Sequence, residues 1–504
     1  MRASVFSHCI VPVGERERVR VVKQSNRING RTFFFPVWLG RELPVHFLFA
    51  LPVPDRLKGQ RMNRSSLISR RSFLKATAAT SLAAPFFMPR LLSAPPSGRV
   101  LHASFGAGGM ALSDLSEIAR HPQVELVAVA DVEAERGEAL KKKWPKVRVY
   151  ADWRELLDKE KELTSVNVST PDHMHGPIAM SAMQRGLHVY GQKPLTHDIY
   201  ETRRLTEMAR DKKLVTQMGI QIHSAAEYRL AVRLIQEGAI GKVKEVHTWS
   251  NKKWGDKGPM PKRNDPVPDG FHWDLWLGVC AERPFIDGRW YHPENWRKRL
   301  DFGTGTFGDM GCHIYDPVFK ALALTAPLSV RSEGAAPNEH SWATDAIIPY
   351  VFPGTAFTAE KKVNVIWYDG DRRPPAEIAA LAGSRLPEQG SIFLGTKGVM
   401  LLPHIAPPKL LPEASFKDFK MPEVQGSNHW HQFVEAVRGN DKTQANFDYA
   451  GPLTEAVLLG SVATRFPKTT LDWDAKQLKF TNVKEANQYV RRIYRKGWEV
   501  AGLV

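Results

Sequence analysis

The chain has 504 residues and a formal net charge of +17, a value that can indicate binding to nucleic acid or to an anionic membrane. The excess lies at the N-terminus: residues 1–61 carry eleven basic against four acidic side chains, residues 62–98 carry five against none, and the rest has only +5. The charge therefore excludes a basic nucleic-acid footprint, and the remaining length predicts two domains.

The N-terminal region contains a twin-arginine string. Residues 69–75 read SRRSFLK, and the apolar, small-residue run 76–84 follows at once. The string resembles the signal of the twin-arginine pathway, which exports folded proteins. Such signals lie at an N-terminus, so we expect translation to begin at Met62. Residues 62–98 would then be a signal peptide and linker, and residues 1–61, which show no helical or strand period, a misassigned start or a disordered extension.

A membrane anchor is the alternative for the hydrophobic residues 33–53. Charged side chains and three prolines interrupt this stretch, whereas a spanning helix needs about 20 largely uncharged residues. We therefore expect no stable membrane span. Of three cysteines, only Cys280 and Cys312 follow the signal, which is too few for a disulfide framework.

Residues 99–221 alternate apolar runs with amphipathic stretches, the pattern of a parallel sheet wound with helices. The predicted strands are 100–105, 125–130, 147–150, 165–169, 188–190 and 214–218. The predicted helices are 111–120, 133–143, 177–185 and 199–212. The pattern predicts an α/β fold of the Rossmann type.

The first strand-to-helix turn reads GAGGMA over residues 106–111, a G-x-G-x-x-A form of the dinucleotide fingerprint. Glycines there let backbone N–H groups approach a pyrophosphate at the helix N-terminus. The second predicted strand ends in Asp131, at the spacing expected for the acid that binds the ribose hydroxyls. The predicted cofactor contacts here are Gly106, Gly108, Gly109, Met110 and Asp131. Asp131 and Glu133 favour NAD by repelling a 2′-phosphate, and Arg136 keeps NADP as the alternative.

Two short motifs follow the fourth and fifth predicted strands. Residues 169–175 read STPDHMH, and residues 191–197 read GQKPLTH. A T-P-x-x-x-H turn followed by a K-P turn, behind the glycine fingerprint, resembles the Gfo/Idh/MocA family, named for glucose-fructose oxidoreductase, inositol dehydrogenase and a rhizopine-catabolism protein. The resemblance covers roughly residues 99–466.

The resemblance implies roles for both motifs. Lys193 would lie near the nicotinamide and stabilise a developing alkoxide, a task suited to a cation at a desolvated site. Gln192 replaces the family's usual glutamate, so one negative charge beside the lysine is lost, and the protonation state of Lys193 stays open. The further implied cofactor contacts are Thr170, Pro171, His175, Gln192 and Lys193 itself.

Residues 222–504 are expected to form a second, α+β domain. An amphipathic helix at 225–236 and a strand at 243–250 open it, and helices are predicted at 428–438 and 452–465. The resemblance implies a large open, mainly antiparallel sheet here and a homodimer or homotetramer formed through it.

A Trp-rich insertion runs from residue 252 to 299. Aromatic ring faces stack on the C–H faces of sugars, and neighbouring polar groups can bond hydroxyls. The candidate substrate-binding residues are Trp290, Tyr291, His292, Trp296 and Arg297. The alternative is that these aromatics pack the loop onto the core.

A glycine-rich segment then leads into Asp309 and His313, spaced so that a helix places both on one face. In the family this pair implies a histidine that removes the hydroxyl proton and an aspartate that grips the substrate or orients the ring. A histidine pKa near working pH suits that task. The catalytic residues are thus expected to be Lys193, Asp309 and His313. Histidine spacings match no metal motif, so no metal is expected.

Two enzymatic functions use these groups. One is an NAD(P)-dependent oxidoreductase acting on a sugar or polyol. The other follows from the expected periplasmic or otherwise exported location, where little free dinucleotide exchanges: a redox-neutral enzyme with tightly bound NAD(P), either a sugar–sugar oxidoreductase or an NAD-dependent glycosidase. A non-catalytic dinucleotide- or sugar-binding protein is the third alternative. The expected partners are a small sugar or polyol and the twin-arginine machinery.

Overall fold

The computed structural model describes residues 23–28, 31–36 and 98–504. The twin-arginine string, Met62 and most of the stretch 33–53 lie outside the described residues. The chain divides into two compact units, Met1–Phe87 and Met88–Val504. In the first, β1 (Lys23–Ile28) pairs antiparallel with β2 (Arg31–Pro36). The sequence between them is Asn-Gly, a strong hairpin signal that a search for strand period misses.

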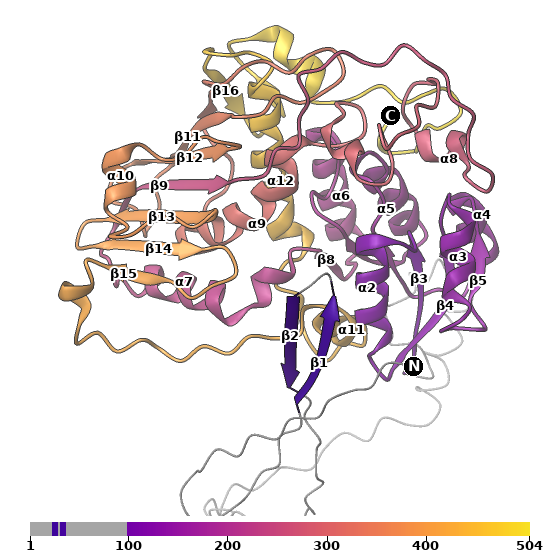
Figure 1. Ribbon diagram of the computed structural model, residues 1–504, viewed down its shortest axis with the longest axis horizontal. Coiled ribbons are helices and arrows are strands. Elements are labelled where there is room, and N and C mark those ends of the chain that lie inside the picture. Colours follow the sequence, from indigo (N-terminus) through magenta and orange to yellow (C-terminus); the bar gives the residue numbers. More distant parts are fainter. Residues whose placement is uncertain (1–22, 29–30, 37–97) are drawn as a thin grey trace, which may run out of the picture. The chain divides into compact units, whose positions relative to one another are not determined.

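In the second unit, a parallel sheet is built from six strands (Figure 1). They are β3 (Val100–Phe105), β4 (Val124–Ala130), β5 (Arg148–Tyr150), β6 (Ser165–Val168), β7 (His188–Gly191) and β8 (Thr216–Met218). Their order is β5-β4-β3-β6-β7-β8, so successive strands are added on one side of β3 up to β5 and on its other side from β6 onward. Ligands of such sheets bind at the carboxyl ends of the strands beside this change of side. The predicted Rossmann fold is confirmed.

Helices cover both faces of this sheet. They are α2 (Gly109–Ala119), α3 (Ala134–Leu140), α4 (Trp153–Lys159), α5 (His175–Gln184) and α6 (Ile199–Asp211). Helix α4 was not predicted; Asp152 caps it by accepting a hydrogen bond from the backbone N–H of Arg154, and Leu156 and Leu157 bury its apolar side. The other four lie within a few residues of their predicted bounds.

The second domain contains a nine-stranded sheet. Its strands are β9 (Val243–Ser250), β10 (Ser329–Val330), β11 (Ile347–Pro353), β12 (Lys362–Asp369), β13 (Gln389–Gly395), β14 (Val399–Pro403), β15 (Lys409–Leu411), β16 (Leu471–Asp474) and β17 (Lys479–Phe480). Only β9 and β12 run parallel, so the sheet is mainly antiparallel, as expected. Along β12 buried Val363, Val365 and Trp367 alternate with more exposed residues, because successive side chains point to opposite faces.

Helix α9 (Gly305–Leu322) lies between the two sheets (Figure 1). It packs with α7 (Ala226–Gln236) and α12 (Phe447–Ala463), while α11 (His429–Val437) packs on α2. One continuous apolar cluster joins the two domains, with Phe105 from the first sheet and Phe319 from α9 among its members. The apolar core is therefore continuous from the nucleotide fold to α9.

Helix α12 begins earlier than predicted. The predicted helix begins at Pro452. The structure starts it at Phe447, where the side chain of Asn446 accepts a hydrogen bond from the backbone N–H of Tyr449. That cap fixes the helix start, and Pro452 then lies inside the helix. Among the helices of the described ranges, none has the length and apolarity to cross a membrane.

Candidate active site

The glycine turn after β3 can hold a dinucleotide. Gly106 has a φ of +103°, and a Cβ there would lie 2.8 Å from the Cβ of Ala111 and 3.0 Å from the Ser169 carbonyl oxygen. Helix α2 starts at Gly109 with no side-chain cap and no acidic residue in its first turn. Its N–H groups and dipole therefore remain available to a pyrophosphate.

Asp131 braces this turn from the end of β4. Its Oδ2 accepts a hydrogen bond from the N–H of Ala107 (2.7 Å), and its Oδ1 accepts one from the N–H of Glu133 (2.9 Å). Burial raises the pKa of Asp131, and those two hydrogen bonds oppose the shift. Each carboxylate oxygen has a further lone pair, so the side chain can position the turn and still accept the ribose hydroxyls predicted for it.

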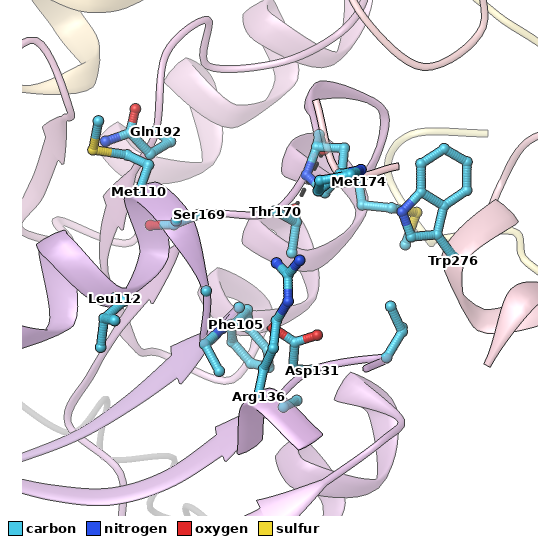
Figure 2. A pocket seen from close by; sticks show the side chains of 18 of the residues that line it. Phe105, Met110, Leu112, Asp131, Arg136, Ser169, Thr170, Met174, Gln192 and Trp276 are labelled. Carbon is cyan, nitrogen blue, oxygen red and sulfur yellow. Dashed lines mark hydrogen bonds between the residues drawn. The ribbon is translucent and has the colours of Figure 1, made fainter. Parts of the chain in front are cut away.

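A cavity of about 940 Å³ lies over these groups. Figure 2 shows Asp131 and Arg136 at one end, Met110 and Gln192 at another, and Thr170 between them. All ten residues predicted to contact the cofactor line this cavity: Gly106, Gly108, Gly109, Met110, Asp131, Thr170, Pro171, His175, Gln192 and Lys193. Their contact with a bound cofactor remains a prediction. The cavity size and the glycine cradle fit a dinucleotide.

Arg136 lies against the glycine turn. Its guanidinium occupies the space where a Cβ on Gly108 would fall, 2.5 Å from Nη1. Its Nε pairs with Glu133 (2.5 Å), and its Nη2 lies 3.0 Å from Nε2 of His292. The arginine that could have attracted a 2′-phosphate is thus partly neutralised by Glu133, in line with the predicted preference for NAD.

Asp114 explains the departure at Gln192. This buried aspartate of α2 was not predicted; it accepts hydrogen bonds from Nε2 of Gln192 (2.8 Å), from Ser169 (2.8 Å) and from Trp430 (2.9 Å). A glutamate at position 192 would set a second carboxylate against Asp114. The glutamine amide donates a hydrogen bond instead, which allows the two side chains to pack together. The only signal in the sequence was the Glu-to-Gln departure itself.

His175 joins the two motif turns. Its Nε2 lies 2.7 Å from the carbonyl oxygen of Thr170, and its Nδ1 lies 2.7 Å from that of Pro194. The ring is 2% exposed. The histidine of the T-P-x-x-x-H motif therefore holds Pro194, the residue after Lys193, in place.

Lys193 forms an ion pair with Asp309. The Nζ atom donates to Oδ1 and to the backbone oxygen of Asp309, both at 2.8 Å. Trp254 donates to Oδ2 (2.8 Å) and Arg297 to Oδ1 (3.3 Å). Burial raises the pKa of Asp309, but Lys193 and Arg297 outweigh it, so that pKa lies well below its usual value. Asp309 therefore supplies a negative charge beside Lys193.

His313 lies one turn further along α9 and is 8% exposed. Burial, with Lys193 as the next cause, holds its pKa well below the usual value, so the imidazole is neutral and can accept a proton at neutral pH. The oxygens of Asp309 bond to Lys193, Trp254 and Arg297, and Nδ1 of His313 is buried without a partner among the described residues. Asp309 therefore orients the lysine, not the histidine ring.

The Trp-rich insertion divides its five candidate residues between two tasks. His292, Trp296 and Arg297 line the cavity, and the Arg297 guanidinium stacks on Trp296 with 4.3 Å to the ring centroid. Tyr291 is 2% exposed within an aromatic cluster, and Trp290 lies under the guanidinium of Arg299. Tyr291 and Trp290 therefore have a packing role in the insertion, which is the alternative that the sequence left open for these aromatics.

The insertion also docks on the loop after β4. Phe271 forms a β-bridge with Glu133, the backbone N–H of Ala134 donates to the carbonyl of Gly270 (3.0 Å), and that of His272 donates to Val132 (2.8 Å). Nε2 of His292 reaches Oε2 of Glu133 at 2.9 Å. A segment of the second domain therefore lies against the loop after β4, beside Asp131, where the adenosine ribose is expected.

The fold and the cavity define a two-domain dinucleotide-binding protein. Residues 102–220 match the model of the oxidoreductase family with an NAD-binding Rossmann fold, and residues 232–500 match that of its C-terminal alpha/beta domain. The chain belongs to the Gfo/Idh/MocA family of oxidoreductases, and its first domain is an NAD-binding domain.

Several curated proteins are similar to part of the chain. Levoglucosan dehydrogenase of Pseudarthrobacter phenanthrenivorans is 27% identical over 33% of this chain and 34% of its own length. Inositol 2-dehydrogenase 4 of Saccharopolyspora erythraea is 28% identical over 37% of this chain and 52% of its own length. A glycosyl hydrolase family 109 protein of Stenotrophomonas maltophilia is 32% identical over 24% of this chain and 29% of its own length. The chain thus spans between about a third and half of these relatives.

Solved structures share the fold. The WlbA dehydrogenase of Bordetella pertussis, in complex with NADH and UDP-GlcNAcA, superposes with a TM-score of 0.54 at 15% identity, covering 75% of this chain and 99% of that one. GenD2 from gentamicin A biosynthesis, in complex with NAD, gives 0.51 at 18% identity, covering 75% and 97%. At these identities the likeness shows the architecture alone.

Proposed function

We propose that the chain is an NAD-dependent oxidoreductase acting on a hydroxyl of a sugar or polyol. The observation that carries this proposal is the ion pair of Lys193 and Asp309 at the cavity wall, one helical turn from the neutral His313. Bound NAD would supply a hydride acceptor, held by the glycine turn and Asp131. The chain's own residues then have to hold the alcohol and move its proton.

His313 acts as the general base. Its neutral imidazole accepts the hydroxyl proton as the hydride leaves the carbon that bears this hydroxyl. Lys193 donates to the oxygen and stabilises the negative charge that develops on it, a contribution that mutagenesis of comparable donors puts at about 100- to 1000-fold in rate. Asp309 holds the lysine side chain in position, because its carboxylate is itself fixed by Trp254 and Arg297.

The names of two relatives, a levoglucosan dehydrogenase and an inositol 2-dehydrogenase, support a sugar or cyclic polyol as substrate. Arg297 lines the cavity and shares Oδ1 of Asp309 with Lys193, so its guanidinium offers N–H donors to substrate hydroxyls there. The test is to incubate the purified full chain with NAD or NADP and with levoglucosan, myo-inositol and glucose, and to follow reduced nicotinamide by absorbance. Formation of NADH with any of them supports the proposal. Tight NAD binding without turnover of any sugar or polyol would support the non-catalytic alternative.

A redox-neutral enzyme is the second candidate, and the docking of the insertion on the loop after β4 favours it. A segment that lies beside the expected adenosine ribose slows cofactor exchange, and a cofactor that stays must be restored in each cycle. The relatives named as glycosyl hydrolase family 109 proteins add support for a glycosidase version. The experiment is to purify the chain without added nucleotide and identify what it carries by mass spectrometry. Stoichiometric NAD with conversion of aryl glycosides, but no net NADH, would favour this candidate.

Export remains part of the proposal. The twin-arginine string at residues 69–75 supports a periplasmic or otherwise exported location, and the open nine-stranded sheet supports a homodimer or homotetramer. Fractionation of cells that express the chain, with Arg70 and Arg71 replaced by lysine in a second strain, tests the exported location. Sedimentation of the purified protein tests the oligomer.

A further inference from the structure

A second imidazole stands beside His313. His404 follows strand β14, from the far part of the second domain, and its ring centroid lies 5.9 Å from that of His313. The side chain is partly exposed, and its Nδ1 bonds to Tyr228. Neither the sequence motifs nor the mechanism above uses this residue.

Tyr228 fixes the hydrogen-bonding state of His404. The tyrosine lies on α7, is 2% exposed, and its hydroxyl oxygen is 2.6 Å from Nδ1 of His404. Burial raises the pKa of Tyr228 well above its usual value, so the hydroxyl keeps its proton. A buried hydroxyl needs an acceptor, and Nδ1 is the partner in reach. Since Nδ1 accepts, the proton of the neutral ring has to be on Nε2.

His404 is therefore a donor where His313 is an acceptor. Burial, reinforced by Lys193, lowers the pKa of His404 to about 4, so the ring stays neutral at working pH. The ring centroids lie 5.9 Å apart, so both imidazoles are close enough to contact one substrate molecule. Hydroxyls on adjacent carbons of a sugar or polyol would offer one oxygen to His404 and one proton to His313.

We propose that His404 is a specificity-determining residue that donates its Nε2–H to the oxygen on the carbon next to the one oxidised, and that Tyr228 is its positioning residue. The substrate class is then a compound with two neighbouring oxygens, not an isolated alcohol. This inference rests on the proposed oxidoreductase function.

The chain contains a matched control pair. His247 of β9 has its Nδ1 3.0 Å from the hydroxyl of Tyr368, the same arrangement as His404 and Tyr228. Tyr368 packs with Trp249 and Leu401 in an apolar cluster that includes no residue of α9, and Nε2 of His247 bonds to Glu245 (2.7 Å). This second pair is a structural element of the sheet. Its variants control for the loss of a buried histidine–tyrosine contact.

The first test measures the histidine tautomer and needs no substrate. The NAD-loaded full chain is labelled with ¹⁵N-histidine, and ring resonances are assigned by comparison with His404→Gln and His247→Gln. The proposal expects His404 as the Nε2–H tautomer, with Tyr228→Phe producing a mixture of tautomers. An Nδ1–H tautomer in the parent chain would overturn it, because Nε2 could then not donate.

The second test is a double-mutant cycle between His404 and the neighbouring hydroxyl. We compare glucose and myo-inositol with their deoxy analogues, for the parent chain and for His404→Ala, using kcat/KM for NADH formation. The proposal expects about a tenfold loss for the full substrates and no loss for analogues that lack the neighbouring oxygen. Equal losses on both, or losses as large in His247→Ala, would overturn it. If no sugar reacts while NAD still binds, the proposed function fails, and the tautomer measurement alone decides whether His404 can be a donor.

Discussion

Lys193 and Asp309, 116 positions apart in the chain, are joined by a 2.8 Å contact from Nζ to Oδ1. The pair links the K-P turn of the nucleotide domain to helix α9 of the second domain. It therefore assembles the site only when the two domains are packed together, and it positions the residue proposed to hold the substrate oxygen.

Replacing Asp309 by asparagine should impair turnover and leave the cofactor bound. The variant keeps the shape of the side chain but removes the charge that Lys193 and Arg297 face. We expect kcat/KM for sugar oxidation to fall about 100-fold or more, as for loss of an oriented electrostatic group. Circular dichroism and retained nucleotide check that the fold persists. Asp448→Asn, at an exposed ion pair with Arg210, is the matched control. An unchanged kcat/KM would remove Asp309 from the mechanism.

Replacing Gln192 by glutamate, the usual family residue, should destabilise this particular chain. It would bring a second carboxylate against the buried Asp114, which now accepts the amide hydrogen bond at 2.8 Å. We expect a loss on the order of 1–3 kcal/mol of unfolding free energy, because a buried group loses its partner. The double variant Asp114→Asn with Gln192→Glu restores one donor and one acceptor. Urea unfolding should show that it recovers most of the loss; equal stability of Gln192→Glu and the parent would contradict the account.

His292→Ala should release the cofactor faster. The side chain ties the insertion to the loop after β4 through the contact of its Nε2 with Oε2 of Glu133 (2.9 Å). Loss of such a polar contact costs about tenfold in an equilibrium constant, which we expect mostly in the dissociation rate. Stopped-flow displacement of NAD measures it. Arg289→Ala, at an exposed ion pair with Glu294 in the same insertion, should dissociate at the parent rate. Equal rates for His292→Ala would show that the insertion does not retain the cofactor.

The free energy of unfolding should fall as the pH drops through 6. Burial lowers the pKa of His188 from 6.5 to about 4, so the unfolded chain takes up the proton first and stability rises with pH over this range. The contribution is present above about pH 6.5 and is lost as the pH falls towards 4. One such group changes the unfolding free energy by up to about 1.4 kcal/mol per pH unit. His188→Gln should flatten the slope of urea stability between these pH values. His272→Gln, at an exposed position, serves as the control.

Short sequence patterns predicted those parts of the site whose residues lie close together in the sequence. The glycine fingerprint, the apolar strands that carry it and the spacing of Asp309 and His313 all lie within short windows, and the structure places them in β3, α2 and α9. Helix α12 shows the limit of such a window: the predicted helix begins at Pro452, whereas the Asn446 cap starts the observed one at Phe447.

Contacts between distant segments had no sequence signal. The partners of Asp114 come from three elements, and Trp430 is 316 positions away from it. Trp254 was recognised as part of an aromatic insertion, but nothing in its neighbourhood indicated a hydrogen bond to Asp309. His404 carries no motif at all, and only its tertiary contacts with Tyr228 of α7 and His313 of α9 bring it to the site.

The central claim is that a hydride passes between a sugar carbon and the nicotinamide in a site served by Lys193, Asp309 and His313. The most direct measurement uses glucose, myo-inositol and levoglucosan deuterated at every ring carbon, incubated with the NAD-loaded chain, followed by mass spectrometry of the extracted nucleotide. The account predicts deuterium on the nicotinamide with the parent chain and its loss in His313→Ala. Nucleotide that stays free of deuterium with every sugar, while the chain holds NAD, would contradict it.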